Sequence, residues 1–317
     1  MKTADVVYVG IDISKETLDM DAGELGARKI ANSPLEVRKT LAAIAQRTQA
    51  DKMLQVCFES AGPYTGALIA QCQAAGLRYS ILNPYKVKCF AKSLAQAKTD
   101  AIDARIIRLY SQVKRPAPTP APRKVLAELD TLVLAREAVM KSVVALRSTL
   151  ETLQGAATKP LRRIIAFNEK KIAEYDRLIA EAVETDAEVS GLVGALSEVK
   201  GVGTLTAVKV VSGMPEIGRL GRRKAAALVG LAPHTRESGK WKGKARIGGG
   251  RKQVRTALFM PATTAIRYNP EMKRIHAHLM AKGKPYKVAL TAVMRRLICH
   301  LDSVAKDYYA KRKEITA

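Results

Sequence analysis

Residues 6–14 read Val-Val-Tyr-Val-Gly-Ile-Asp-Ile-Ser, and this stretch decides the fold of the first third of the chain. Five of its nine residues are valine or isoleucine, which is typical of a buried strand. Around it, the apolar patterns predict four more strands and four helices. The strands cover residues 18–21, 28–31, 53–59 and 78–82, and the helices cover residues 35–46, 64–75, 85–96 and 100–113. This order of elements indicates a layered α/β domain.

A proline-rich stretch ends the α/β region. Residues 115–122 (RPAPTPAP) hold four prolines, each with a fixed φ and no amide hydrogen, so we expect a stiff, extended linker. We therefore divide the chain into an α/β domain at 1–114, this linker, long helices at 123–190 and a basic, mostly helical domain at 191–317. No alternating strand pattern is evident in the last domain.

Apolar residues recur every seven positions after the linker. The first series is Val125, Leu132, Val139, Leu146 and Leu153, and a second follows Pro160 at Leu161, Ile165, Ile172, Tyr175 and Ile179. Such a pattern predicts helices that bury this seam, in an antiparallel hairpin or in an intermolecular coiled coil. Two ordinary helices of a bundle explain the spacing equally well. Leu129, Val143 and Leu150 form the alternate seam, and Arg136 interrupts it, which indicates a hydrated or register-setting contact there.

The charge of the chain points to a polyanionic partner. The 317 residues include 54 Lys and Arg against 29 Asp and Glu, a net charge of +25 at pH 7. Residues 201–317 hold 25 basic but only 6 acidic side chains, spread over predicted helices and glycine-rich loops. A protein of the membrane surface would concentrate its cations on one amphipathic helix. Nucleic acid is therefore the partner that the distribution favours.

Several protein classes are excluded by simple patterns. No stretch approaches the ~18 uninterrupted apolar residues that a membrane-spanning helix needs, so we expect no membrane partner. The first residues include Asp too early for a secretory leader, and we expect a cytoplasmic protein. The four cysteines show no paired spacing, which predicts free thiols rather than disulfides or a zinc site.

Four carboxylates stand out in the α/β domain. Asp12 lies in an apolar strand, Glu59 ends another, and Asp100 and Asp103 share one face of a predicted helix. The charge of a carboxylate in a buried strand must be compensated, and a divalent cation can do so. Carboxylate oxygens are ligands that suit Mg²⁺. Two such ions can flank a phosphate that is being cut. The alternative is that Asp12 and Glu59 face solvent while Asp100 caps its helix.

Two glycine-containing segments in the basic domain could bind phosphate. Gly201 and Gly203 lie between two apolar stretches, as in a helix-hairpin-helix turn, although an ordinary helix–helix turn has the same pattern. Ser238 precedes a glycine within a ring of cations that could bind a phosphodiester and favour attack by the serine. A passive phosphate-binding loop is the alternative. In either case, the residues around Ser238 that we expect to contact nucleic acid are Arg236, Lys240, Trp241, Lys242, Lys244, Arg246, Arg251, Lys252 and Arg255.

These segments occur in an order that resembles the DEDD-type insertion-sequence transposases of the IS-one-ten family. The matching pieces are VGIDISKETLD, FESAGPYTG, ILNP, AKTDAIDARIIRLY, KGVGTLTA and GLAPHTRESGKWKG with its downstream GGGR and ALFMPA. They extend over nearly the whole chain, and their order and spacing together are specific. Lys200 departs from the pattern, since relatives often have proline before the Gly-x-Gly turn.

The resemblance implies a fold and a chemistry. It implies a RuvC-like RNase H fold for the first domain, with Asp12, Glu59, Asp100 and Asp103 as the carboxylates that bind Mg²⁺. It implies that Ser238 is a nucleophile that forms a covalent phosphoserine link to DNA, beside the metal site of a partner subunit. The coiled-coil helices would mediate assembly into a homo-oligomer, a dimer or a tetramer.

The resemblance also implies partners. A structured noncoding bridge RNA would pair with donor and target DNA, so that base pairing reads the sequence while the protein holds the backbone. The protein would act in the bacterial cytoplasm at the nucleoid. Two other functions remain open: a metal-dependent nuclease or Holliday-junction resolvase without serine chemistry, and a basic architectural protein that binds nucleic acid without cutting it.

Overall fold

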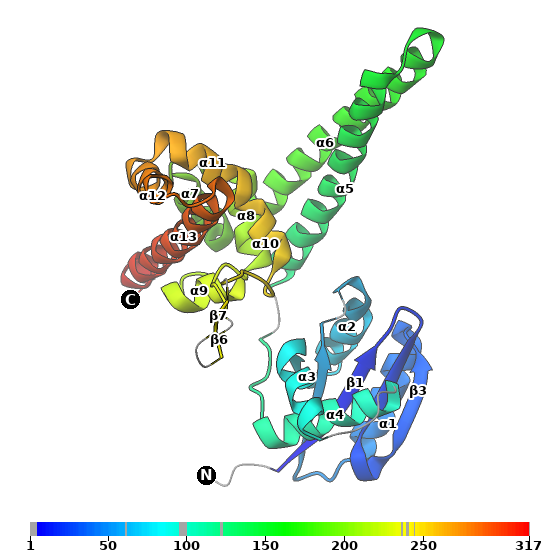
Figure 1. Cartoon of the computed structure of the whole chain (residues 1–317). Coiled ribbons are helices and arrows are strands. Elements are labelled where there is room, and N and C mark those ends of the chain that lie inside the picture. Colours follow the sequence, from blue (N-terminus) through cyan, green and yellow to red (C-terminus); the bar gives the residue numbers. More distant parts are fainter. Residues whose placement is uncertain are drawn as a thin grey trace. The chain divides into compact units, whose positions relative to one another are not determined.

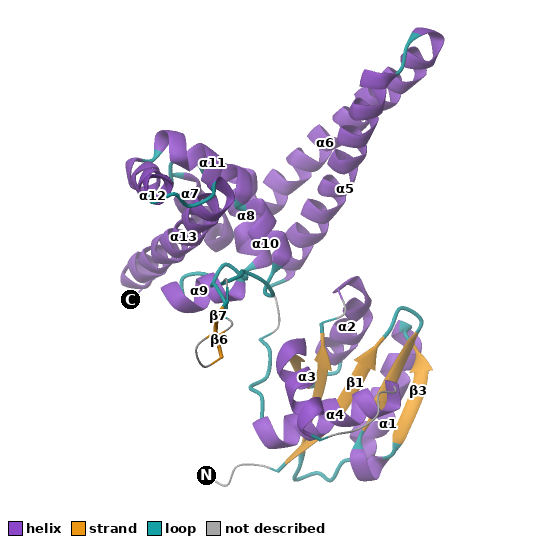
Figure 2. Ribbon diagram, viewed as in Figure 1, coloured by secondary structure: helices purple, strands orange, loops and turns teal. Residues whose placement is uncertain are grey.

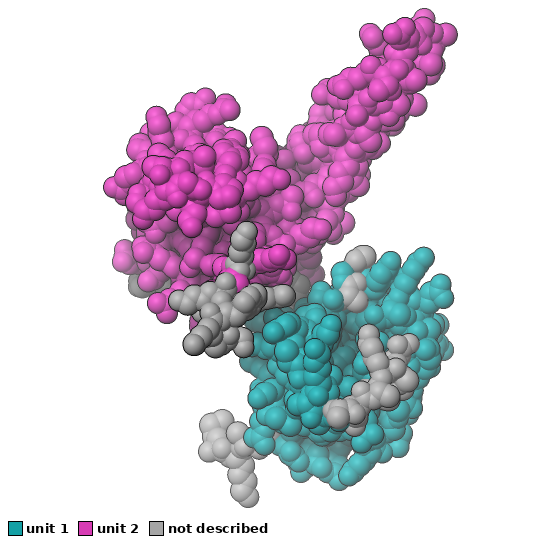
Figure 3. All heavy atoms as spheres, viewed as in Figure 1, with its two compact units in different colours: residues 1–121 teal, residues 122–317 magenta. Residues whose placement is uncertain are grey.

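The computed structural model describes residues 5–60, 62–94, 100–120, 123–235, 237–238, 241–243 and 245–316. The chain divides into two compact units, Met1–Ala121 and Pro122–Ala317, which Figure 3 shows in different colours. The division falls inside the proline-rich stretch. Each unit has its own hydrophobic core, so each is described by itself.

Unit 1 is built on a five-stranded mixed sheet (Figure 2). Its strands are β1 (Val6–Ile13), β2 (Thr17–Asp21), β3 (Ala27–Ala31), β4 (Met53–Glu59) and β5 (Arg78–Leu82), in the spatial order β3-β2-β1-β4-β5. The first three strands are antiparallel neighbours, whereas β4 and β5 run parallel to β1. The predicted α/β architecture is confirmed, and this sheet is compatible with an RNase H-like domain.

Helices cover both faces of this sheet. The helices are α1 (Pro34–Arg47), α2 (Gly66–Ala74), α3 (Pro84–Ser93) and α4 (Asp100–Lys114), with short 3-10 turns at Gly23–Leu25 and Gly62–Thr65. Val9 and Phe58 share one core with α1 and α2, and Tyr8 and Cys57 share the other with α3 and α4. Adjacent strand residues thus point to opposite faces.

The starts of two helices follow from local sequence. Ser33 and Asn83 each accept hydrogen bonds from backbone amides of the first turn that follows, and a proline stands directly after each of them. Such caps satisfy amides that have no partner inside the helix, and proline is pre-organised for the first helical position.

Gly10 lets α4 lie directly on β1. A methyl group added at Gly10 would come within 2.2 Å of the carbonyl oxygen of Ala104 and 2.5 Å of the amide nitrogen of Arg108. Both are backbone atoms, so they cannot rotate away. A second contact fixes the same helix: Arg108 Nε lies 2.9 Å from Asp21 Oδ1, and that oxygen also accepts a hydrogen bond from the Gly23 amide.

We expect Gly10→Ala to destabilise unit 1 by about 1–3 kcal/mol, because overpacking forces backbone shifts. Hydrogen exchange of α4 and β1 amides in increasing urea measures this loss. Gly66→Ala is the matched control, since a methyl group there meets nothing within 4 Å and alanine favours a helix. Equal exchange rates for Gly10→Ala and wild type would show that α4 does not depend on this approach.

Two long helices, α5 (Lys124–Thr152) and α6 (Thr158–Glu184), begin unit 2. They pack side by side in Figure 1, and the ion pairs Arg136–Asp176 and Arg147–Glu169 join them with antiparallel spacing. Val143, Ile165 and Ile172 form their distal core. Within the chain, the heptad residues therefore pack in an antiparallel hairpin, and Arg136 in the seam reaches a partner carboxylate.

The rest of unit 2 is almost entirely helical. Its helices are α7 (Ala187–Ser197), α8 (Thr204–Gly213), α9 (Arg222–Leu228), α10 (Lys252–Ala257), α11 (Phe259–Tyr268), α12 (Pro270–Ala281) and α13 (Tyr286–Thr316). One small ladder, β6 (Glu237–Ser238) with β7 (Trp241–Lys242), was not expected from the sequence. Strands of two residues are too short to produce an alternating pattern, which explains the difference.

Candidate functional site

Asp12 and Glu59 lie at the carboxyl ends of neighbouring parallel strands. Ile11 of β1 pairs in register with Phe58 of β4, so the next residue of each strand, Asp12 and Glu59, follows at the same level. Both residues are partly buried, and both have interactions within the chain. They stand an even number of residues after Tyr8 and Cys57, so all four belong to the sheet face that carries α4.

The amino end of α4 lies at the same edge of the sheet. Tyr110 near the end of α4 shares a core with Tyr8, whereas Ala104 approaches Gly10, so α4 runs antiparallel to β1. Its first turn, with Asp100 and Asp103, therefore lies toward the end of β1 that carries Asp12. Asp103 is partly buried, and the side chain of Asp100 lies outside the described part of the chain. The fold thus brings the four predicted positions to one edge.

The donor set at this edge has the chemistry that Mg²⁺ prefers. All four predicted ligands are carboxylates, and hard oxygen ligands suit this ion. Among the side chains that the structure describes, no group of three His, Cys, Asp or Glu is close enough to hold a metal ion. The side chain of Asp100 lies outside the described residues, and the metal site is a prediction that rests on placement and chemistry.

A further carboxylate near this edge was missed in the sequence. Asp19 of β2 pairs in register with Asp12, so it shares the same sheet face. Its Oδ2 lies 3.2 Å from Nζ of Lys29, which compensates the charge. Asp21 is likewise engaged by Arg108. These ion pairs depend on the sheet register and on the position of α4, and the sequence alone does not contain that information.

Gly201 serves packing in unit 2. Its φ is +99°, and an added methyl group would come within 2.9 Å of the Ala265 amide nitrogen. The positive φ and the close approach of the α11 backbone therefore both require glycine at position 201. Gly203 is exposed and is the N-cap residue of α8, and a methyl group added there would meet no atom within 4 Å. Contact of this turn with nucleic acid stays a prediction, and Gly203 is the glycine that is open to a ligand.

Ser238 stands where a short hairpin turns. It pairs with Trp241 across the β6–β7 ladder, with two residues between them. The hydrogen-bonded pair of His234 and Arg246 closes the base of this loop, with N–O distances of 2.8 and 3.1 Å. Arg236, Lys240 and Lys244 lie outside the described residues, as do the side chains of Ser238, Trp241 and Lys242.

Two of the predicted nucleic-acid contacts hold the ends of this loop in place. Arg251 donates bidentate hydrogen bonds of 2.6 and 2.7 Å to Glu216, and Arg255 donates to the carbonyls of Val229 and Gly249. Burial raises the pKa of Glu216, but the Arg251 guanidinium overcomes this effect and lowers it. Their contact with nucleic acid stays a prediction. Arg246 and Lys252 are exposed and open to a phosphate.

Asp302 fixes the loop that leads into α9. It is 3% exposed, and its carboxylate accepts hydrogen bonds of 2.8 and 3.0 Å from the amides of Gly218 and Gly221. Glu216 lies in this loop and holds Arg251, so Asp302 helps position the arginine that supports the Ser238 segment. The sequence did not indicate the role of either acid. The partners of Asp302 lie 84 and 81 residues away along the chain, and the partner of Glu216 lies 35 residues away.

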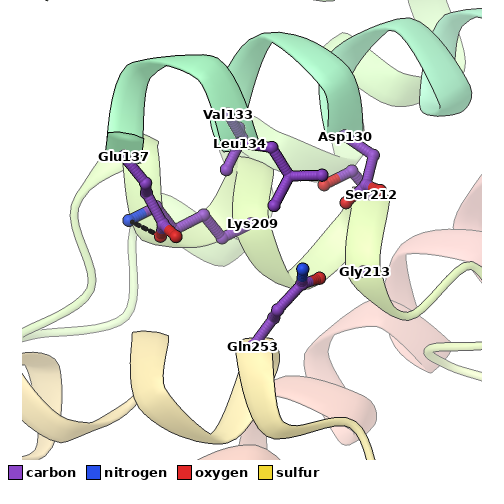
Figure 4. Close-up of a pocket in the computed structure, with 8 residues that line it drawn as sticks. All are labelled: Asp130, Val133, Leu134, Glu137, Lys209, Ser212, Gly213 and Gln253. Carbon is purple, nitrogen blue, oxygen red and sulfur yellow. Dashed lines mark ion pairs between the residues drawn. The ribbon is translucent and has the colours of Figure 1, made fainter. Parts of the chain in front are cut away.

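A separate polar pocket lies between α5, α8 and α10 (Figure 4). Lys209 Nζ lies 2.8 Å from Glu137 Oε1 there, and the buried Ser212 Oγ has no hydrogen-bond partner among the described residues. Burial, with Glu137 nearby, raises the pKa of Asp130. The folded state therefore binds this proton more tightly, and Asp130 reduces stability as the pH rises above its unfolded pKa. The Lys209–Glu137 ion pair in this pocket attaches the α5–α6 hairpin to α8.

Comparisons with protein-family models agree with this arrangement. Residues 9–156 match a transposase model, that of the DEDD transposases of IS110 elements. Residues 193–277 match a second model, described as the transposase IS116/IS110/IS902 family. The first match contains the four carboxylates, and the second contains Ser238. No curated protein matches the chain. In the described part of the chain, no helix has the length and apolar character to cross a membrane.

Proposed function

Because the chain belongs to the IS110 family of transposases, we propose that it exchanges DNA strands through a serine nucleophile that acts beside a carboxylate metal site. The observation that supports this most is the meeting of Asp12 and Glu59 with the amino end of α4 at one sheet edge. Ser238, at the turn of a hairpin whose base is closed, supplies the second component.

The carboxylate edge would prepare the DNA for cutting. Asp12, Glu59, Asp100 and Asp103 would hold Mg²⁺, which supplies Lewis-acid stabilisation of charge on the phosphoryl oxygens. The contact of Gly10 with α4 and the Arg108–Asp21 ion pair hold α4 against β1, and they would thereby keep the two halves of the proposed ligand set at a fixed separation. The chain's own part in this step is to orient the phosphate for attack.

Ser238 would carry the DNA during exchange. Its Oγ attacks a backbone phosphorus, an Oγ–P bond forms, and the bond from phosphorus to one deoxyribose oxygen breaks. The serine proton passes to solvent, and the released deoxyribose oxygen takes up a proton. A hydroxyl of the other DNA strand then attacks the phosphoserine, which restores a phosphodiester and frees Ser238. Cations of the surrounding loop, Arg246 and Lys252 among them, would offset the phosphate charge.

The partners in this proposal are donor DNA, target DNA, a structured noncoding RNA and a second copy of the chain. Base pairing with the RNA would choose the two DNA sites, while the basic unit 2 binds the backbones. The serine of one subunit would act with the carboxylates of the partner subunit, in a dimer or a tetramer. The helical hairpin, acting as a coiled coil, would bring the subunits together.

Subunit mixing tests this composite arrangement. We expect Ser238→Ala and Asp12→Asn proteins, each inactive alone, to regain up to about a quarter of wild-type adduct when they are refolded together, since half of the dimers are mixed and each mixed dimer keeps one of its two sites. The measurement is the yield of covalent protein–DNA adduct with Mg²⁺, both DNAs and RNA from the flanking region. No recovery from the mixture would contradict a site shared between subunits.

A further inference from the structure

The two ends of the α5–α6 hairpin carry opposite charges. The distal part, residues 139–171, holds seven basic and two acidic side chains, whereas the proximal segments 124–138 and 172–184 together hold three basic and seven acidic ones. In Figure 1 the distal part extends away from the other helices of unit 2. A basic end on an otherwise acidic hairpin is a local feature and does not follow from the overall charge of the chain.

Three cations at this end have no ion pair within the continuously described stretch 123–235. Lys159, Arg162 and Arg163 are exposed, and with Thr158 and Ala166 they line an open depression on α6 that contains no acidic residue. Among the other basic residues of the hairpin, four pair with a carboxylate: Arg136, Arg147, Lys171 and Arg177. Lys124, Lys141 and Lys170 have no ion pair in that stretch. Half of the six unpaired cations of the hairpin therefore line one depression.

The position of these cations in their helix is unfavourable for stability. They occupy the first two turns of α6, and its first turn has no acidic residue. The amino end of a helix carries a partial positive charge that acts mainly within the first turn, where it favours acids and disfavours a cation such as Lys159 by about 0.3–1 kcal/mol. Residues that oppose the local preference of a helix are typical of functional sites.

The shape and charge favour a nucleic-acid backbone over a second copy of the chain. Lys159, Arg162, Arg163 and Lys170 follow one ridge of α6, with the small side chain of Ala166 between them. Eleven residues of helix span about 16 Å, along which a duplex presents a negative charge every ~1.7 Å. Two such basic ends would repel each other, so a contact between them would need a polyanion.

We propose that this end of the hairpin, which we call the hairpin tip (Lys159, Arg162, Arg163, Ala166 and Lys170), is a binding site for the phosphate backbone of DNA or RNA. The tip belongs neither to the carboxylate edge nor to the Ser238 loop. It would hold nucleic acid at a distance from the reacting phosphate and position it. Its contacts are to phosphate, so they contribute affinity and orientation without sequence preference.

The test compares two double variants with the same change in net charge on the same hairpin. Arg162→Gln/Arg163→Gln removes two tip cations, and Lys124→Gln/Arg177→Gln removes two exposed cations from the acidic base. Full-length proteins bind a duplex DNA of arbitrary sequence and, separately, an RNA hairpin at several salt concentrations. We expect the tip variant to bind at least one of them about tenfold more weakly, with a salt slope reduced by about two, while the base variant resembles wild type.

Three results would overturn the proposal. An equal loss in both variants would mean that only overall charge matters, and no loss in either would mean that the tip does not touch nucleic acid. A changed oligomeric state of the tip variant in size-exclusion chromatography with light scattering, at unchanged affinity, would make the tip a protein–protein contact. The DNA and RNA arms identify which backbone is bound. Binding needs no catalysis, so the outcome is independent of the roles of Ser238 and Asp12.

Discussion

We expect the replacement of Ser238 with alanine to abolish strand exchange and the covalent protein–DNA adduct, and to leave binding of nucleic acid intact. The change removes the oxygen that would form the bond to phosphorus in the proposed mechanism, and alanine is compatible with the extended backbone of β6. Loss of a catalytic serine costs on the order of 10⁶-fold in a well-characterised hydrolase, so we expect less than about one thousandth of wild-type exchange. Gel separation of recombinant products and of protease-sensitive adduct measures it.

The matched control for Ser238→Ala is Thr235→Ala. Thr235 is an exposed hydroxyl residue in the same loop, just after His234 at the closed base. We expect this variant to retain exchange within a few-fold of wild type. If Ser238→Ala keeps cleaving DNA while Asp12→Asn does not, the protein is a metal-dependent nuclease, and Ser238 only contacts phosphate.

Replacing Asp12 with asparagine is the second change with a large expected effect. Asparagine preserves the size of the side chain and removes the charge that a divalent cation requires. We expect strand exchange and adduct formation to fall by about 10³-fold or more, because metal stabilisation of the phosphoryl oxygens is lost. Rates are measured over a titration of Mg²⁺ and of Mn²⁺, with thermal unfolding to verify that the variant is folded.

Asp51→Asn is the control for Asp12→Asn. Asp51 is an exposed residue before β4, and its replacement removes the same charge from the same unit. Wild-type activity in Asp51→Asn and loss in Asp12→Asn would identify the position as decisive. Full activity of a folded Asp12→Asn protein would contradict a role for the carboxylate edge in catalysis.

The sequence predicted the sheet of unit 1 well, because the signals there are local. Valine and isoleucine mark β1, and Ser33 and Asn83 with the prolines that follow them mark the starts of α1 and α3. Each of these preferences acts within a few residues, so no knowledge of distant contacts is needed. The same holds for the heptads of α5 and α6, although their spacing could not distinguish a hairpin within the chain from a contact between chains.

The roles of individual charges could not be predicted in the same way. Arg251 and Arg255 look like other cations of the basic domain, yet Glu216 and two backbone carbonyls hold them. Asp19 and Asp12 are both carboxylates in strands, and the sequence does not show that Asp19 pairs with Lys29. A charge acquires its role from a partner that the fold brings from far along the chain, and a single sequence does not specify that partner.

The most direct test of a serine that carries DNA is to identify the amino acid attached to it. Wild-type protein is reacted with Mg²⁺, both DNAs and flanking RNA, the adduct is trimmed with nuclease and digested with protease, and the peptides are analysed by mass spectrometry. We expect a nucleotide mass on the peptide that contains Ser238, at its hydroxyl. Attachment at another residue, or strand exchange without any adduct, would contradict the proposed mechanism.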